Sequence, residues 1–124
     1  MVFDLRERTE MFSINIINLI GKFPKNVTGI VIAKQILRSG TSVGANLEEA
    51  DAASSRKDFF HKISICTREA KETNYWFRII IKSKLLHKNS DQNEAKYLLK
   101  ESEELSRIFS AIIKRKDEKE TKSS

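Results

Sequence analysis

Basic side chains recur at helical spacing between positions 68 and 82 of this chain. Arg68, Lys71, Tyr75, Arg78 and Lys82 follow one another at intervals of three or four residues, so a helix would place all of them on one face. Guanidinium and ammonium groups neutralise phosphates, and an aromatic ring can stack on an exposed base. The pattern indicates binding of nucleic acid, in particular of single-stranded or structured RNA. An ordinary solvated helix face is the alternative.

The net charge of +6 comes from the segment that contains these basic residues. Residues 55–88 contain nine Lys and Arg against three Asp and Glu, whereas the segments before and after them are balanced, with six against six and eight against eight. An excess confined to one segment creates a local field that attracts a polyanion. Lys34 and Arg38, one helical turn apart in the preceding segment, could extend this basic surface.

Few other residues have spacings that suit chemistry. Four-helix bundles bind paired metal ions through Glu-x-x-His motifs, but Asp58 and His61 form the only comparable pair, and Lys84 stands three residues before His87. We find no glycine-rich phosphate loop, no Ser, His and Asp set at motif spacing and no zinc-ligand cluster. We therefore expect no metal site, no cofactor and no enzymatic activity. The single Cys66 excludes a disulfide within the chain.

Close contacts between helices are expected at two places. Gly40 and Gly44 lie inside an apolar pattern that continues through both of them, and each glycine costs about 1 kcal/mol in a helix interior. Their presence favours a site where a neighbouring helix approaches, with a hinge or loop as the alternative. We also expect Glu49, Glu69 and Glu72 to be structural rather than catalytic, with one or two of them accepting hydrogen bonds at a helix contact.

The elements that position these residues are predicted to be four amphipathic helices. Glycine is scarce, Pro24 is the only proline and no alternating apolar pattern is sustained, which favours helices over strands. We expect helices over 4–22, 28–53 and 55–87, with Thr28 and either Ser54 or Ser55 as N-caps. A fourth helix carries the apolar stripe of residues 98–113. Short links between such helices predict an all-α, antiparallel up-down-up-down four-helix bundle.

The length of 124 residues suits one domain. We assign residues 1–113 to this domain and expect residues 114–124 to form a disordered charged tail. Charged residues begin at Asp4, so we predict neither a signal peptide nor a membrane span, and a cytoplasmic location. Apolar residues around Trp76, including Tyr75, Phe77 and Ile79, exceed a single stripe and favour self-association.

Three runs of residues resemble the 23S rRNA intervening sequence protein family, which comprises small bacterial four-helix bundles. They are QILRSGTSVGANLEEA from Gln35 to Ala50, DFFHK from Asp58 to Lys62, and EAKETNYW from Glu69 to Trp76. The resemblance covers about residues 5–113. The family is similar to the accessory protein of diversity-generating retroelements, which forms a pentamer and binds nucleic acid and a reverse transcriptase. The resemblance therefore implies a homopentamer that binds RNA or DNA, with no catalytic motif to transfer.

Two hypotheses follow from the sequence. The first is a non-enzymatic, self-associating bundle that binds structured RNA or DNA through a basic surface on its second and third helices. The second is a protein-binding scaffold or assembly factor without direct nucleic-acid contact, whose basic face meets an acidic protein. Binding that weakens as salt increases would favour the first hypothesis.

Overall fold

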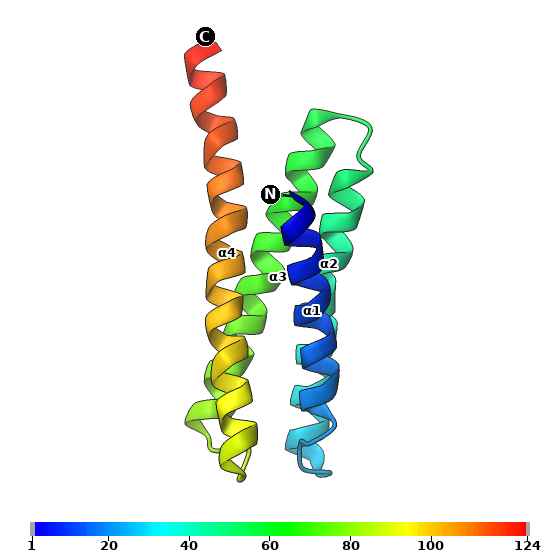
Figure 1. The fold of residues 1–124 in the computed structure, drawn as a ribbon, viewed down its shortest axis with the longest axis vertical. Helices are drawn as coiled ribbons and strands as arrows, with labels where there is room; N and C mark the ends of the chain where they lie inside the picture. Colours follow the sequence, from blue (N-terminus) through cyan, green and yellow to red (C-terminus); the bar gives the residue numbers. More distant parts are fainter. Residues whose placement is uncertain (1, 124) are drawn as a thin grey trace.

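The protein is a bundle of four long helices in a computed structural model (Figure 1). The structure describes the backbone of residues 2–123 and the side chains of residues 4–116. Helix α1 spans Val2–Ile20, α2 Val27–Asp51, α3 Arg56–Lys82 and α4 Asn89–Ser123. Successive helices run in opposite directions, and no strand occurs in the described backbone.

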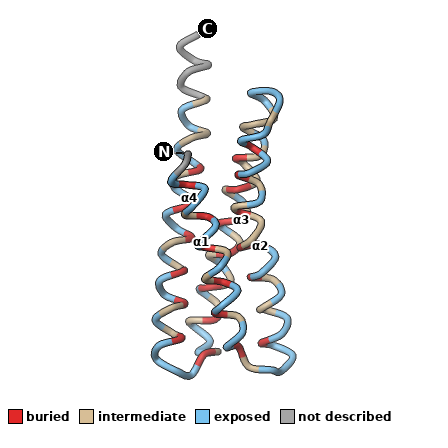
Figure 2. Tube along the Cα trace, turned by 45° about the vertical axis from the view of Figure 1, so that its right-hand side comes forward, coloured by how far each residue is buried: buried red, intermediate tan, exposed pale blue. Residues whose placement is uncertain are grey.

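The helices pack in cyclic order. Each packs beside the next along the chain, α4 also packs beside α1, and the backbones of the diagonal pairs do not approach closely over the described residues. One buried face of each helix therefore points to a shared core, seen as the red inner positions of the tube in Figure 2. The largest fully buried side chains include Phe12, Ile16, Ile36, Ile63, Phe77, Leu98, Leu105 and Phe109. The predicted all-α, up-down-up-down four-helix bundle is confirmed.

The cap of α2 differs from the expected one. Asn26, not Thr28, is the N-cap, because its side-chain oxygen accepts a hydrogen bond from the Gly29 backbone N–H at 2.9 Å. Thr28 lies inside the first turn of α2. Gly29 is needed here, since a Cβ at this position would overlap the carbonyl oxygen of Pro24. Of the two candidate caps for α3, the structure selects Ser55, whose Oγ accepts from the Asp58 N–H at 3.1 Å.

Helix α3 ends at Lys82, five residues before the predicted end at His87. The backbone closes as a Schellman motif, in which the Leu85 N–H donates to Ile80 O at 3.1 Å and the Lys84 N–H donates to Ile81 O at 3.2 Å. Lys84 adopts the left-handed conformation that the motif requires, with φ 56°. Glycine usually fills this position, so the sequence offers no stop signal.

Helix α4 begins at Asn89, before the apolar stripe of residues 98–113 from which it was predicted, and its backbone continues to Ser123. It rises beyond the N-terminal end of α1 in Figure 1. The sequence predicts a disordered tail over residues 114–124. The structure describes the side chains of this segment only up to residue 116, so the disorder stays a prediction.

Candidate nucleic-acid interface

The basic residues predicted on the third helix do share its outer face. Arg68, Lys71, Tyr75, Arg78 and Lys82 are all exposed, whereas the opposite side of α3 faces the core. The Arg78 Nε donates to Asn74 Oδ1 at 3.0 Å, and its guanidinium lies 5.6 Å from the centre of the Tyr75 ring. Within residues 4–116, none of the four cations has an acidic partner. We call these five residues the α3 stripe.

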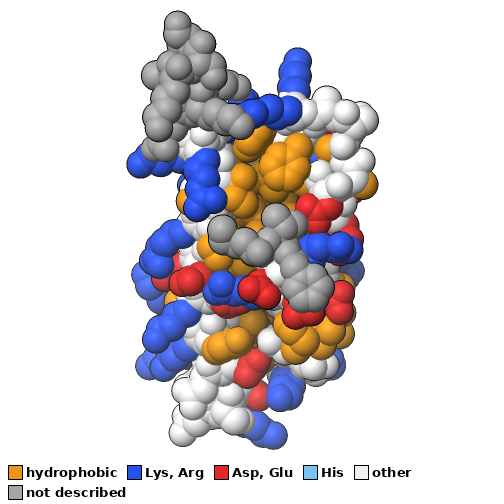
Figure 3. All heavy atoms as spheres, turned by 45° about the horizontal axis from the view of Figure 1, so that its top comes forward, with side chains coloured by type: hydrophobic (Ala, Val, Ile, Leu, Met, Phe, Trp, Pro, Cys, Tyr) orange, Lys and Arg blue, Asp and Glu red, His pale blue; other side chains and the backbone are white. Residues whose placement is uncertain are grey.

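Helix α4 adds basic residues to the edge of the α3 stripe. Lys71 and Arg78 line a shallow hollow of about 330 Å³ together with Arg107 of α4. Lys96 lines a second hollow beside Lys84, at the end of α3. Figure 3 shows Lys and Arg side chains gathered along the left edge of the molecule, on the α4 side. The candidate interface therefore spans α3 and α4.

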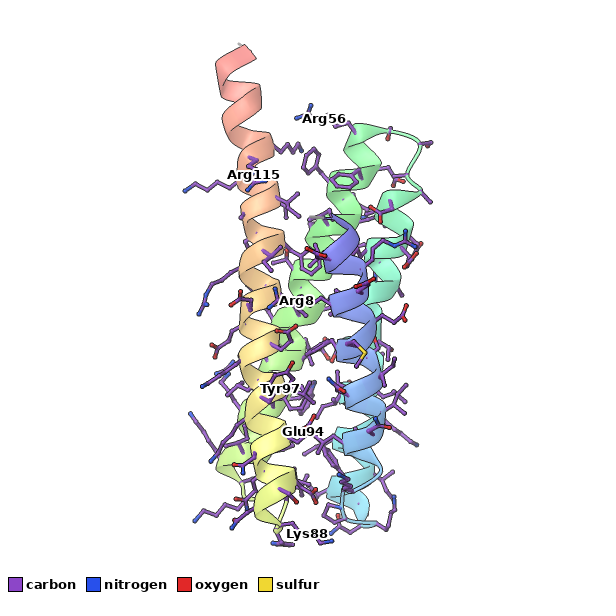
Figure 4. All side chains as sticks on the ribbon, in the orientation of Figure 1. Arg8, Arg56, Lys88, Glu94, Tyr97 and Arg115 are labelled. Atoms are coloured by element: carbon purple, nitrogen blue, oxygen red, sulfur yellow. The ribbon has the colours of Figure 1, made fainter. Side chains whose placement is uncertain are left out.

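Two acidic residues of α4, Glu101 and Glu104, face α1 rather than the α3 stripe. Glu101 accepts two hydrogen bonds of 2.8 Å from Arg8 of α1, and Glu104 lies 3.6 Å from the same guanidinium. Figure 4 shows Arg8 between α1 and α4. The hydrogen bond to Glu101 raises the pKa of Arg8. Helix α4 is neutral when its charges are counted along the sequence, and the pairing of Glu101 with Arg8 shows why Lys96 was missed. Arg107 keeps an acidic neighbour, Glu103, whose carboxylate lies 3.8 Å from its guanidinium and which lines the same hollow.

Arg38 does not join the α3 stripe. Its guanidinium forms ion pairs with Glu72 and, at 3.3 Å, with Glu69, both on α3. The Trp76 Nε1 donates to the same Glu72 carboxylate at 3.2 Å. Arg38 therefore ties α2 to α3, and the two carboxylates serve at a helix contact, as expected. Lys34 is exposed on α2 and has no ion pair among the described side chains.

Gly40 and Gly44 both face α1 of the same chain. A Cβ on Gly40 would overlap the Cδ1 of Ile16, which is fully buried. A Cβ on Gly44 would lie 3.2 Å from Thr9 Oγ1 and 3.3 Å from Thr9 Cβ. Both glycines are inside α2, so the alternative of a hinge or loop is wrong. Their absent side chains allow α1 to pack closely.

The exposed apolar surface lies on other helices than expected. Phe77 is fully buried, and Trp76 is only partly exposed. Among the side chains of residues 4–116, seven of the nine large hydrophobic ones that are exposed belong to α1 and α2 instead, and Tyr75 and Tyr97 are the others. The seven are Met11, Ile14, Ile17, Val27, Ile30, Val31 and Leu37.

The remaining candidates for chemistry are the thiol of Cys66 and the side chains that could bind a metal ion. Cys66 is buried and donates a hydrogen bond to the Val43 carbonyl at 3.4 Å, and burial raises the pKa of its thiol to about 12. Among the described side chains, no three His, Cys, Asp or Glu residues are placed to hold a metal ion. None of the helices, over the part described, has a stretch that is both long and apolar enough to cross a membrane.

Comparison with known proteins decides the family. The sequence pattern of the family described as 23S rRNA-intervening sequence protein matches residues 3–111. The chain belongs to this family. A crystal structure at 1.70 Å of a family S23 protein of unknown function from Bacteroides thetaiotaomicron is 34% identical to the chain. The match covers 92% of this chain and 99% of that one, with a TM-score of 0.78. No curated protein matches.

The runs that resemble the 23S rRNA-intervening sequence family coincide with packing residues. The first run lies on α2 and includes Gly40, Gly44 and Arg38, and the third lies on α3 and includes Glu72 and Trp76. These residues form the contacts of α2 with α1 and α3. Of the α3 stripe, Lys71 and Tyr75 lie within the third run, whereas Arg68, Arg78 and Lys82 lie outside the runs but inside the matched residues 3–111.

Proposed function

We propose that this member of the 23S rRNA-intervening sequence family is a non-enzymatic, cytoplasmic protein that binds structured RNA or DNA through the α3 stripe and the adjoining surface of α4. The observation that carries the proposal is the set of four exposed cations on α3 without acidic partners. Cations that are already paired gain little from a phosphate, whereas unpaired ones release the counterions condensed on the nucleic acid.

The stripe has the dimensions of a backbone contact. Arg68 and Lys82 are fourteen residues apart, which corresponds to about 21 Å along a helix. Successive phosphates of one duplex strand are about 3.4 Å apart along the axis, so the stripe spans about six of them. Tyr75, 46% exposed and held beneath the Arg78 guanidinium, adds a surface on which an unpaired base can stack.

The test replaces the four cations of the stripe together. Changing Arg68, Lys71, Arg78 and Lys82 to Gln should reduce affinity for an RNA hairpin more than about tenfold near 100 mM salt and lower the slope of log K against log salt by about three. Fluorescence anisotropy over a salt series measures both quantities, and circular dichroism checks that helicity is unchanged.

A matched control removes the same charge at the other end of the bundle. Arg56 and Arg115 are labelled at that end in Figure 4, and neither they nor Lys57 and Lys114 form an ion pair among the described side chains. Changing these four to Gln should leave affinity within about twofold of the unaltered protein. Equal losses from both variants would mean general charge attraction, and undiminished binding by the stripe variant would remove α3 from the interface.

Self-association accompanies this proposal. The seven exposed apolar side chains of α1 and α2 support a contact with further copies of the chain, and the resemblance implies a homopentamer. The same apolar surface also favours the second hypothesis, a protein-binding scaffold or assembly factor. That hypothesis requires that the protein show no salt-sensitive binding of nucleic acid, while the basic face binds an acidic protein surface.

A further inference from the structure

Two long segments of the chain contain no acidic residue at all. Residues 11–47 hold Lys22, Lys25, Lys34 and Arg38, and residues 73–90 hold Arg78, Lys82, Lys84 and Lys88, with not one Asp or Glu in either segment. Because the helices are antiparallel, Ser39 lies level with Thr73, so residues of the first segment up to Ser39 share the end that carries the α1–α2 and α3–α4 links with residues 73–90 (Figure 1). Residues 40–47 continue past that level along α2, where Val43 lies beside Cys66. Folding therefore brings the four lysines of the two links, Lys22, Lys25, Lys84 and Lys88, to one end, whereas Arg38 lies farther along α2 and is paired with Glu69 and Glu72.

The two links meet at this end of the bundle. They line a hollow of about 470 Å³, with Lys22 on the α1–α2 side and His87 and Lys88 on the α3–α4 side. Figure 4 shows Lys88 at the extreme end of the molecule. Lys25, Lys84, His87 and Lys88 are all exposed. We call Lys22, Lys25, Lys84 and Lys88 the basic end.

The acidic residue nearest to the hollow does little to neutralise it. Asp91 is 7% exposed, and its Oδ1 lies 3.5 Å from the Lys22 Nζ. This contact accounts for Lys22 alone. Lys25, Lys84 and Lys88 have no ion pair within residues 4–116. Three cations without an ion pair therefore remain in the two links, and Lys88 among them lines the hollow.

The basic end adjoins the α3 stripe without a gap in the chain. Lys82 is the last residue of the α3 stripe, and the Schellman turn follows it directly. Lys84, within that turn, lines a hollow together with Lys96 of α4. The stripe runs along the side of the bundle, while Lys88 lies at its end. The two surfaces face different directions, so a ligand that touches both must bend around the α3–α4 corner.

We infer that the basic end is a second phosphate-binding surface, and that the ligand contacting both surfaces is a flexible single-stranded RNA segment rather than a straight duplex. A duplex stays straight over distances on the order of 150 base pairs in DNA, far longer than this molecule, whereas an unpaired strand can turn the corner. The exposed ring of His87 beside the hollow gives an unstacked base a surface to contact. This inference rests on the proposed nucleic-acid function and specifies its ligand.

The experiment compares two RNA probes on the full chain. One is an unstructured strand of about 20 nucleotides and the other is a duplex of the same length. The end variant changes Lys25, Lys84 and Lys88 to Gln and leaves the Lys22–Asp91 contact intact. We expect it to bind the single strand about tenfold more weakly near 100 mM salt, with a salt slope reduced by about two. Its affinity for the duplex should stay within about twofold of the unaltered protein.

Two further variants separate the possible outcomes. The control changes Lys57, Lys114 and Arg115 to Gln, at the opposite end, and should leave both probes unaffected. The stripe variant should weaken both probes. Unaltered single-strand binding by the end variant, alongside losses in the stripe variant, would overturn the inference and leave the proposed function standing. Equal losses on strand and duplex, or equal losses in the control, would overturn it as well. If the unaltered protein binds neither probe, the proposed function itself fails.

Discussion

Gly40 contributes to the fold through the space that it leaves for α1. The Ile16 side chain fills this space and is itself fully buried. Changing Gly40 to Leu should therefore lower the free energy of unfolding by about 3 kcal/mol through overpacking, even after the better helix propensity of leucine is included. Urea denaturation measures the loss.

Gly44 offers a graded comparison. A Cβ on Gly44 would lie close to the Thr9 side chain. However, Gly44 also borders an open hollow lined by Ile14 and Ala45, and a larger side chain can occupy this hollow. Gly44→Leu should lower the free energy of unfolding by about 1 kcal/mol, less than Gly40→Leu. A Gly40→Leu variant as stable as the unaltered protein would contradict the close packing of α1.

Cys66 should be unreactive in the native protein. Burial raises the pKa of its thiol to about 12, so at pH 8 about one molecule in 10⁴ carries the reactive thiolate. Iodoacetamide should modify the thiol quickly in urea and very slowly without it. Because the unfolded chain loses this proton near the ordinary value of 9.0, the free energy of unfolding should fall as pH rises above about 9. Rapid alkylation of the native protein at pH 8 would rule out the buried site.

The sequence predicts which side chains of a helix are exposed, but it does not predict which residues of another helix they contact. The exposed side of α3 follows from the spacing of Arg68, Lys71 and Arg78, because a helix fixes which residues share a face. The partners of Arg38 do not follow from spacing. Glu69 and Glu72 are 31 and 34 residues away along the chain, and their contact depends on how α2 and α3 are aligned.

At the level of the helix, Asn26 tests the corrected start of α2. Its side chain satisfies the Gly29 N–H, so Asn26→Ala should lower the free energy of unfolding by about 1 kcal/mol. Thr28→Ala provides the control, because Thr28 is exposed and makes no hydrogen bond through its side chain among the described contacts. Thermal denaturation of both variants decides the position of the cap. A larger loss from Thr28→Ala would restore the cap predicted from the sequence.

The helices themselves were predictable because apolar residues recur at helical spacing throughout. Their ends were less so. The Schellman turn places Lys84 where glycine usually stands, and the apolar Leu85 and Leu86 that follow continue the pattern of a helix. Leu86 is buried, 4% exposed, in the corner itself. Sequence spacing cannot separate a buried corner from a further helical turn.

For the whole molecule, the exposed apolar residues of α1 predict assembly. Sedimentation at micromolar concentration should report several times the chain mass of 14.3 kDa. Ile17 is 52% exposed, and Ile17→Glu should shift the protein towards the monomer because a carboxylate resists burial. Asn18→Glu, at the adjacent exposed position, should leave the mass unchanged. A monomer for the unaltered chain would refute self-association.

Counting charges by segment predicted the α3 stripe and overlooked the rest of the basic surface. Segment 1–54 is neutral overall, yet its acidic residues stand at either end of the 11–47 stretch. Only the antiparallel arrangement shows that this stretch, up to Ser39, lies level with residues 73–90. Similarly, the pairing of Glu101 with Arg8 separates the charges of α4. Such a distribution belongs to the fold and cannot be obtained from a running sum along the sequence.

The end of the bundle that carries the α1–α2 and α3–α4 links holds more cations than carboxylates, although Asp91 and Glu94 of α4 lie there, and this imbalance gives the molecule an electric dipole along its length. Every one of the 17 Asp and Glu residues lies outside residues 11–47 and 73–90. In the field of a polyanion such a rod experiences a torque that turns its positive pole forward before contact. Screening over about 8 Å at physiological ionic strength shortens the range of that torque. Added salt should therefore slow the association of RNA more than it speeds dissociation, because it abolishes the orientation in which the protein arrives.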